Sequence, residues 1–407
     1  MKRVTKIKSI RQAAIRITGK KVLVRVDFNV PIKDGRVADD YKIAACLPTI
    51  RFLSRYKCKV ILASHLGRPL GKRVVKMSLE PVAKKLEKIL GKEVGFIKDS
   101  TGLAVGTAVA RMKPGEIILL ENLRFHDGET ENSLKFAKEL AQLADIYVND
   151  ALAVSHRRHA SVDRIKKYLP SYAGLLLEKE VENLSKILRP KKPLVIIIGG
   201  AKAATKIGLI KNLYRKADKI LVGGAAANNF LKAKNFEIGK SLIDKKSLAL
   251  VRSILRKESV GAKKIILPVD TVVGTSLVGE NKSAQVKGPV QIGKSDVILD
   301  IGPQTIRLFN GYIRRAETIV WNGPLGMFED NKFKSGTLAM ALAVGKRSAK
   351  GAFSLVGGGE TIEALVKVKM LDQINWVSTG GGAMLTFLAG GKMPGLEGIA
   401  EVLLMYN

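Results

Sequence analysis

The sequence predicts an α/β fold built mainly on parallel strands. Short apolar runs of strand length alternate along the chain with segments of helical periodicity, in the order strand, loop, helix. Most of these runs are continuously apolar, which is typical of parallel strands covered by helices on both faces. The chain has 407 residues, and this length suits two domains of about 150–200 residues better than one core.

The predicted strands form two series along the chain. The first series lies at 21–27, 59–63, 116–121 and 145–149. The second lies at 194–198, 219–222, 263–267, 297–300, 318–321, 353–356 and 376–378. Helical patterns such as Leu79–Leu90 and Ser133–Ala144 fall between the strands. This order predicts right-handed crossovers between parallel strands.

A predicted helix separates the two series. The residues from Gly174 to Leu188 form one helical pattern, and Pro190 and Pro193 end it. We therefore expect an N-terminal lobe at 1–173, an interdomain helix at 174–188 and a C-terminal lobe at 189–378. A helix that bridges two lobes is suited to act as a hinge.

The charge balance is strongly basic. There are 70 Lys and Arg residues against 36 Asp and Glu residues, and the formal net charge is +34. Such a field attracts anions and raises their association rates. The basic residues are scattered, which favours solvated helix faces. Sequence-independent binding of nucleic acid is the alternative interpretation.

Cysteine usage and hydropathy bear on the compartment. Two cysteines, Cys46 and Cys58, are too few for a disulfide framework, so we expect buried reduced thiols. No apolar stretch reaches the length of about 18 residues that a membrane span needs. The first 21 residues lack acids and are rich in Lys and Arg, as in a transit peptide. Because the first predicted strand already begins at Lys21, we expect a cytoplasmic protein instead.

Glycines directly follow four predicted strands of the second series, and helix-compatible sequence follows each group. The groups are Gly199-Gly200, Gly223-Gly224, Gly357–Gly359 and Gly380–Gly382. Ligands of open parallel sheets sit at the carboxyl ends of strands. Helix N-termini there present free N–H groups to phosphates, and glycine allows close approach. The pattern favours a nucleotide phosphate site, with ordinary tight turns as the alternative. No P-loop or dinucleotide glycine motif is present.

Two lysines follow the first glycine pair at helical spacing. Lys202 and Lys206 lie four positions apart, so they share one helix face. Both can point at phosphates. A solvated helix face is the alternative.

All four histidines lie in the first half, each close to an arginine in a segment that follows a strand. The segments are Ser64-His-Leu-Gly-Arg68, Glu121-Asn-Leu-Arg-Phe-His126 and Ser155-His-Arg-Arg-His159, and Arg25-Val-Asp-Phe-Asn29 ends the first strand. Arginine binds carboxylates and phosphates bidentately, so this set is suited to a small phosphorylated acid. A metal site at His156 and His159 is the weaker alternative, because no cysteine accompanies them. The residues themselves therefore predict phosphoryl transfer between a small anionic acid and a nucleotide.

At these segments the chain resembles the phosphoglycerate kinase family. The resemblance runs from about Gly19 to the C-terminus, in the family's order. The matching stretches include Arg25-Val-Asp-Phe-Asn-Val-Pro31, Ser64-His-Leu-Gly-Arg-Pro69, Glu121-Asn-Leu-Arg-Phe125, Gly199-Gly-Ala-Lys202, Trp321-Asn-Gly-Pro324, Gly357-Gly-Gly359 and Ser378-Thr-Gly-Gly-Gly-Ala383.

The resemblance implies transfer of the acyl phosphate of 1,3-bisphosphoglycerate to MgADP, giving 3-phosphoglycerate and MgATP. It implies that the glycerate is held by Asp27, Phe28, Asn29, Lys42, His65, Leu66, Gly67, Arg68, Arg124 and Arg157. It implies that the nucleotide is held by Lys202, Lys206, Gly223, Gly224, Glu329, Gly357, Gly358, Gly359, Glu360 and Thr361, with Glu360 at the metal. The residues implied to act on the phosphoryl group in flight are Lys42, Lys202, Gly358 and Gly381.

The resemblance also implies an architecture. The family has two Rossmann-like lobes that close over their substrates by hinge bending, and closure excludes water. Its C-terminal segment, here 379–407, returns to the first lobe. The implied partners are small-molecule substrates, ATP or ADP, and Mg²⁺, with no membrane; we expect a monomer.

Three positions depart from the family's pattern. Lys42 stands where the family has a catalytic arginine, Glu360 where it has a metal-associated aspartate, and Thr205 where it has an aspartate before Lys206. Lysine cannot copy a bidentate guanidinium, so the first departure bears on turnover. A chain that has lost most turnover and binds polyanions is one alternative, and an unrelated nucleotide-dependent enzyme is another.

Overall fold

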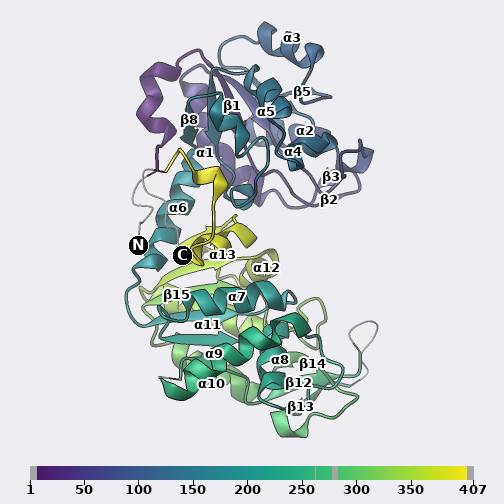
Figure 1. Ribbon diagram of the computed structural model, residues 1–407, viewed down its shortest axis with the longest axis vertical. Coiled ribbons are helices and arrows are strands. Elements are labelled where there is room, and N and C mark those ends of the chain that lie inside the picture. The colour runs from purple at the N-terminus through teal and green to yellow at the C-terminus, as the bar shows by residue number, and fades with distance from the viewer. Residues whose placement is uncertain (1–6, 262, 277–282, 401–407) are drawn as a thin grey trace. The chain divides into compact units, whose positions relative to one another are not determined.

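The computed structural model describes residues 7–261, 263–276 and 283–400 (Figure 1). The chain divides into two compact units. The first comprises Met1–Ser185 with Gly382–Asn407, and the second comprises Lys186–Gly381. Each unit is built on its own six-stranded sheet.

The sheet of the first unit is parallel throughout, in the order β5-β6-β4-β1-β7-β8. Its strands are β1 (Lys21–Arg25), β4 (Lys59–Ala63), β5 (Gly95–Ile97), β6 (Ile117–Leu120), β7 (Ile146–Asn149) and β8 (Ser171–Ala173). The α-helices of this part of the chain are α1 (Tyr41–Arg55), α2 (Glu80–Leu90), α3 (Leu103–Arg111), α4 (Asp127–Thr130), α5 (Leu134–Ala141) and α13 (Gly382–Leu388). A small antiparallel hairpin joins β2 (Ile32–Lys33) to β3 (Arg36–Val37).

One side of this sheet forms a continuous core with the helices. Leu23, Ile61 and Tyr147 of the central strands pack with Phe136 and Leu140 of α5. These side chains are essentially removed from water, which is the main source of the unit's stability. Burial on both faces explains why the strands read as unbroken apolar runs.

The sheet of the second unit is also parallel, in the order β11-β10-β9-β15-β16-β17. Its strands are β9 (Leu194–Ile198), β10 (Lys219–Val222), β11 (Ile265–Ile266), β15 (Thr318–Asn322), β16 (Phe353–Gly357) and β17 (Trp376–Ser378). The helices α7 (Ala203–Leu213), α8 (Gly224–Ala233) and α9 (Leu248–Val260) contact one another. The helices α10 (Pro303–Ile313), α11 (Ser335–Ala349) and α12 (Gly359–Lys367) form a second contacting group, whose core includes Phe309, Val344, Leu365 and the sheet residue Trp321.

The predicted strand at 297–300 does not belong to the parallel sheet. It forms β14 (Val297–Ile301), which pairs antiparallel with β12 (Thr271–Gly274); β12 in turn pairs with β13 (Gln285–Lys287). The sequence of a short apolar run does not indicate whether its partner strand is parallel or antiparallel. The sequence analysis therefore could not distinguish this strand from those of the parallel sheet. The α/β class and the predominance of parallel strands are confirmed.

Helix α6 (Leu175–Leu188) contains residues assigned to both units. Its first turn is held by Asp150, whose Oδ1 accepts the backbone N–H groups of Leu176 and Leu177 at 3.0 and 3.1 Å. A Cβ on Gly174 would lie 2.2 Å from this oxygen, so only glycine fits before the helix. The helix start is therefore set by a buried carboxylate after β7, which satisfies N–H groups that lack intrahelical partners.

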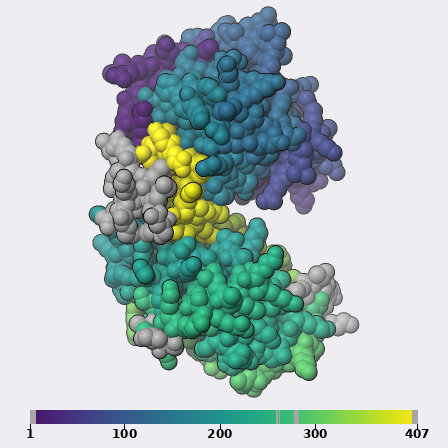
Figure 2. Space-filling model, viewed as in Figure 1, coloured from purple at the N-terminus to yellow at the C-terminus, as the bar shows by residue number. Residues whose placement is uncertain are grey.

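The described residues 382–400 of the C-terminal segment belong to the first unit, where Figure 2 shows yellow atoms against blue-green ones, whereas 379–381 belong to the second unit. The Gly395 N–H donates to the Ser155 carbonyl at 2.8 Å, and the Asn149 amide donates to the Gly395 carbonyl at 2.9 Å. Cys46 and Cys58 are buried free thiols. Within the described residues, no helix combines the length and apolarity needed to cross a membrane.

Candidate functional site

The first unit gathers basic side chains, together with the carboxylate of Asp27, at the carboxyl ends of its parallel strands. Asp27 follows β1, His65 follows β4, Arg124 follows β6 and Arg157 follows β7. These strands are neighbours in the sheet, so their carboxyl ends share one edge. The structure thus brings together residues that the sequence analysis took from four separate segments. We call this set, with Lys42 and Arg68, the basic cluster.

Lys42 belongs to this cluster. It lies in the first turn of α1, and its Nζ donates to Asp27 Oδ2 at 2.7 Å and to the Asn29 carbonyl at 3.4 Å. The Asp27 side chain is nearly buried, with 6% exposure, whereas that of Lys42 keeps 30%. Arg36, a basic residue six positions earlier, lies exposed on β3 of the hairpin. The lysine therefore carries the positive charge beside Asp27.

His65 is a neutral donor candidate. Its Nδ1 lies 3.3 Å from the Arg25 guanidinium, which only donates hydrogen bonds, so Nδ1 is the acceptor and the proton is on Nε2. Burial, followed by the charges of Arg25 and Arg124, holds the pKa of His65 well below its ordinary value. The imidazole can therefore offer Nε2–H to a ligand without carrying a charge.

Arg124 has buried donors without partners. One guanidinium nitrogen, NH1, donates to the Gly67 carbonyl at 2.6 Å. Its Nε and NH2 atoms are buried and find no hydrogen-bond partner in the described structure. Burial and the neighbouring guanidinium groups of Arg25 and Arg157 lower the pKa of Arg124 to about 10. Unsatisfied buried donors are costly, and an anionic ligand would satisfy them.

The remaining predicted residues of this site shape its backbone. The Phe28 N–H donates to Ser64 Oγ at 2.9 Å, and the Gly67 N–H donates to Asn29 Oδ1 at 3.0 Å. The buried Leu66 presents its carbonyl to the Asn122 amide at 2.7 Å. Arg68 is exposed, yet its charge contributes to lowering the pKa of both Arg124 and Arg157. Asn29 thus joins the loop after β1 to the loop after β4.

Sequence reasoning included Arg25 in its set of basic segments but missed Glu129 and Ser161, which hold Arg25 beneath the basic cluster. Arg25 is fully buried, and its Nε donates to Ser161 Oγ at 2.8 Å. Glu129, also fully buried, accepts from the Ser161 hydroxyl at 2.7 Å and lies 3.7 Å from the Arg25 guanidinium. An acid inside a basic site compensates part of its repulsion. Glu129 lies in the short helix α4, which follows the Arg124 segment. Its position close to a predicted site segment was the one sequence feature that pointed to it.

The histidines after β7 do not form a metal site within the described residues, where no group of three metal-ligating side chains is found. His159 Nδ1 lies 3.7 Å from Glu129 Oε1. Burial and the charges of Arg25 and Arg124 lower its pKa to about 3. His156 contacts the Arg157 Nε at 3.4 Å, and burial lowers its pKa as well. Both imidazoles are therefore neutral members of the basic environment.

The second unit has a cavity of about 350 Å³ among the loops that follow its strands. It unites Gly224, Glu329 and Glu360, three of the residues implied to hold nucleotide. It also adds residues that sequence reasoning missed, among them Ala201, Asn228, Leu242, Asp300, Pro324 and Leu325. We call this the nucleotide cavity. Pro324 lies inside the quoted Trp321–Pro324 motif, so it was accessible to sequence reasoning; Leu242 and Asp300 gave no such signal.

The glycines at this edge have two different roles. A Cβ on Gly199 would lie 2.0 Å from the Pro324 carbonyl oxygen, and one on Gly224 would lie 2.7 Å from the Gly200 nitrogen. Gly223 likewise faces Leu325 at 2.7 Å. These glycines let the turns after β9, β10 and β15 pack together, as the tight-turn alternative holds. Gly359, in contrast, has nothing within 4 Å of a Cβ position, which leaves room for a ligand.

Lys206 is buried and held by Asn322. Its Nζ donates to Asn322 Oδ1, and the Asn322 amide donates to the Gly357 carbonyl at 2.7 Å. Burial lowers the pKa of Lys206 to about 8, partly opposed by Glu360 and reinforced by Lys202. Lys202 is exposed at the N-terminal end of α7, one turn from Lys206. The ammonium groups of Lys202 and Lys206 therefore both lie near the N-terminal end of α7, close enough for the charge of Lys202 to affect the pKa of Lys206.

Helix α12 presents its N-terminal end beside these groups. Gly358, at φ 107°, precedes the helix, which begins at Gly359. Thr361 is fully buried and its hydroxyl accepts the Gly323 N–H at 2.9 Å, so it holds the turn after β15. Burial, then the neighbouring Glu329, raises the pKa of Glu360, and Lys206 opposes this. Gly381, at φ 50°, follows β17 and has open space around its Cβ position.

The comparisons with known proteins decide the family. The family model described as phosphoglycerate kinase matches residues 12–391. A phosphoglycerate kinase of Thermosipho africanus is 47% identical over 390 residues, covering 95% of this chain and 96% of the relative. The chain belongs to the phosphoglycerate kinase family. A relative with that name from Moorella thermoacetica is 45% identical over 388 residues, covering 95% of this chain and 98% of the relative.

Solved phosphoglycerate kinase structures agree. The structure from Coxiella burnetii has a TM-score of 0.82 at 41% identity, covering 96% of this chain and 98% of that chain. The structure from Pyrococcus horikoshii has a TM-score of 0.81 at 32% identity, covering 93% and 96%. The chain is a phosphotransferase with a carboxyl group as acceptor, and its reaction is the reversible phosphoryl transfer of phosphoglycerate kinase in glycolysis.

Proposed function

We propose that the two sites divide the ligands of this reaction between them. The basic cluster of the first unit binds 3-phosphoglycerate or 1,3-bisphosphoglycerate, and the nucleotide cavity of the second unit binds ATP or ADP. The observation that carries the proposal is Arg124, whose buried Nε and NH2 have no partner within the described structure. A phosphate or carboxylate accepts from such a fork at two points.

In this assignment the glycerate is held by Asp27, Phe28, Asn29, Lys42, His65, Leu66, Gly67, Arg68, Arg124 and Arg157. The neutral state of His65 supports a role as a hydrogen-bond donor to the ligand, because Nε2 carries a proton without the ring having to take up a charge. Asp27 accepts from Lys42, so it also fixes the lysine. Leu66 and Gly67 contribute through the loop geometry that Asn29 and Asn122 hold.

An affinity measurement tests the assignment of Arg124. We expect Arg124→Ala to weaken 3-phosphoglycerate binding by about tenfold or more, the usual cost of a lost charge-assisted contact. Arg111→Ala is the matched control, because Arg111 is an exposed arginine at the end of α3. Isothermal titration should show near-wild-type binding for the control. Equal losses in both variants would remove the assignment and indicate a general charge effect.

The nucleotide assignment uses Lys202, Lys206, Gly223, Gly224, Glu329, Gly357, Gly358, Gly359, Glu360 and Thr361. Lys206 supports it, since a lysine buried beside a helix N-terminus is a cation prepared for phosphate. The open position at Gly359 supports close approach to the first turn of α12. Gly223, Gly224 and Thr361 act through the shape of the turns. Glu329, in the same cavity, is assigned to the ribose.

Mg²⁺ fits this donor set. Magnesium is commonly held by one or two carboxylates together with substrate phosphates and water. Glu360 lies beside a second carboxylate, Glu329, and near Lys206. Glu360 is therefore the residue proposed to act on the nucleotide-bound metal. When bound, the ion would neutralise phosphate charge.

The proposed groups acting on the phosphoryl in flight are Lys42, Lys202, Gly358 and Gly381. Charge spreads over three equatorial oxygens in this transition state, so positioned positive charge and backbone N–H groups are what the protein supplies.

We also propose small-molecule partners only, a cytoplasmic location and a monomer. Sedimentation tests the last. The charge of +34 makes RNA the competing partner, and an absent gel shift at physiological salt would exclude it.

A further inference from the structure

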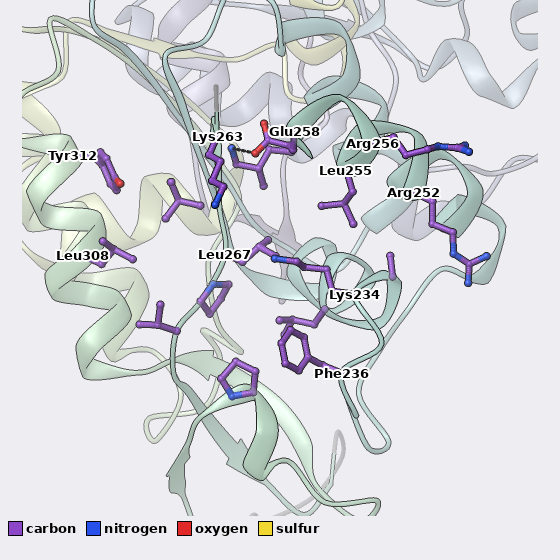
Figure 3. A pocket seen from close by; sticks show the side chains of 17 residues that line it. Lys234, Phe236, Arg252, Leu255, Arg256, Glu258, Lys263, Leu267, Leu308 and Tyr312 are labelled. Carbon is purple, nitrogen blue, oxygen red and sulfur yellow. Dashed lines mark hydrogen bonds between the residues drawn. The ribbon is translucent and has the colours of Figure 1, made fainter. Parts of the chain in front are cut away.

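The second unit has a larger cavity that shares no lining residue with the nucleotide cavity. It measures about 1050 Å³ and lies where β11, α8, α9 and α10 meet (Figure 3). Sites for small molecules typically measure roughly 300–1,000 Å³. Its lining includes Phe236, Leu255, Ile266, Leu267, Leu308 and Tyr312. We call it the edge cavity, because β11 is the outermost strand of the sheet.

The edge cavity is apolar within and cationic at its rim. Lys234, Arg252, Arg256 and Lys263 are exposed residues that line it, against a single acid, Glu258. Figure 3 shows the ammonium groups of Lys234 and Lys263 pointing toward the space beside Leu267. Among the described residues, no salt bridge to an acidic residue is found for either lysine. The rim therefore attracts an anionic group and offers it two donors.

The acid of the cavity is already engaged by the backbone. Glu258 Oε1 accepts the Lys264 N–H at 3.0 Å, and Oε2 accepts the Ile265 N–H at 3.1 Å. The Ile265 N–H belongs to the first residue of β11, on whose free side an added peptide strand would pair, and Lys264 immediately precedes the strand. Glu258 thus occupies backbone donors at the start of the edge strand. Its single negative charge is outnumbered by the four basic residues of the rim. The geometry disfavours strand addition. The cavity is left to a ligand that contacts the apolar lining and the basic rim of the cavity.

We propose that the edge cavity binds an amphipathic small-molecule anion, with an aliphatic or aromatic body and one carboxylate, sulfonate or phosphate head. The body lies on Leu255, Leu267 and Leu308, and the head lies between Lys234 and Lys263. Apolar burial supplies the affinity, and the two ammonium groups supply the preference for an anion. Val269, which is 46% exposed, also lines the cavity, and Val290, which is 84% exposed, follows the lining residue Pro289 in the chain.

Direct binding measurements test the proposal. The probe is anilinonaphthalene sulfonate, whose fluorescence rises in apolar sites, and the competitors are decanoate and decanol. We expect saturable binding that decanoate displaces more effectively than decanol. We expect the double variant Lys234→Ala/Lys263→Ala to lower the affinity about tenfold or more. Both lysines are exposed, so folding and phosphoryl transfer should be preserved.

The matched control removes the same charge from another face of the second unit. Lys346→Ala/Lys350→Ala changes two exposed lysines at the end of α11 and should alter probe affinity less than about twofold. Equal losses in the two double variants would overturn the proposal. So would displacement of the probe by ATP, which would place it in the nucleotide cavity. Equal potency of decanol and decanoate, or binding only of an acidic amphipathic peptide, would overturn it too.

Discussion

Lys42 Nζ lies 2.7 Å from Asp27 Oδ2, so the lysine is tied to the loop that follows the first strand. The contact fixes a positive charge at the edge of the basic cluster. It also uses one of the three ammonium donors. A guanidinium would keep further donors in a fixed plane.

Removing this charge should slow the reaction. We expect Lys42→Ala to lower kcat by about 10²–10³, the usual cost of one lost transition-state donor, with a smaller effect on substrate affinity. Lys42→Arg should keep or raise kcat. A coupled assay with 3-phosphoglycerate and MgATP measures both.

Arg36→Ala is the control, because Arg36 is basic and exposed on the hairpin. Its turnover should match that of the unchanged protein. Near-normal turnover of Lys42→Ala combined with collapse in Arg36→Ala would transfer the role to Arg36.

Glu360 should govern the magnesium requirement. Glu360→Gln removes the charge with little change in volume, so we expect a lower rate and a higher Mg²⁺ concentration for half-maximal activity. Glu360→Asp should be tolerated, because only the reach changes. An unchanged magnesium titration of the Gln variant would mean that other groups hold the metal.

Salt should weaken the apparent affinity for 3-phosphoglycerate. The net charge of +34 attracts anions over distances that the Debye length limits. That length falls from about 10 Å at 0.1 M to about 3 Å at 1 M ionic strength. KM measured from about 0.05 to about 0.5 M KCl should therefore rise. A flat response would show that the net charge does not serve the site.

Asp300 should make the second unit less stable as the pH rises. Burial raises its pKa to about 7, although its carboxylate accepts the N–H groups of Gly336 and Ile301 at 2.8 Å each. The folded state then binds the proton more tightly than the unfolded state. Its contribution is present below the unfolded pKa of about 3.9 and is lost as the pH rises toward 7.

The measurement is the slope of unfolding free energy against pH. Between about pH 4 and about pH 7 this one group lowers stability by at most about 1.4 kcal/mol per pH unit. Asp300→Asn should flatten the slope, whatever its effect on absolute stability. Urea unfolding of both proteins at matched pH values gives the comparison. Parallel slopes would contradict the raised pKa.

His65 should stay neutral in the folded protein. Because Arg25 donates to its Nδ1, nitrogen NMR should find the proton on Nε2 and no titration between about pH 5.5 and about pH 8, where an ordinary histidine titrates. A titration of His65 near its ordinary pKa would contradict the lowered pKa, and a proton on Nδ1 would contradict the assigned tautomer.

The sequence determined the strand order along the chain and the α/β class, because continuous apolar runs and helical periodicity are local properties. The strands at 59–63 and 194–198 match β4 and β9 in both bounds. The motifs at Arg25–Asn29, Ser64–Arg68 and Trp321–Pro324 identified the family before any contact was known. Strand direction is not a local property. β14 and β15 are both short, mostly buried strands of five residues, yet β14 pairs antiparallel with β12 and β15 pairs parallel with β9.

Only the tertiary structure decided which groups meet and which charges are compensated. Glu129 is buried against Ser161, which lies more than thirty positions away in the sequence, and against Arg25, which lies more than a hundred positions away. No sequence pattern joins these three residues. The same holds for Gly224, whose lack of a Cβ is needed because Gly200 approaches from another strand. Residue types record which chemistry is available. Burial, the tautomer of His65 and the pKa of Asp300 depend on neighbours that the fold brings from elsewhere in the chain.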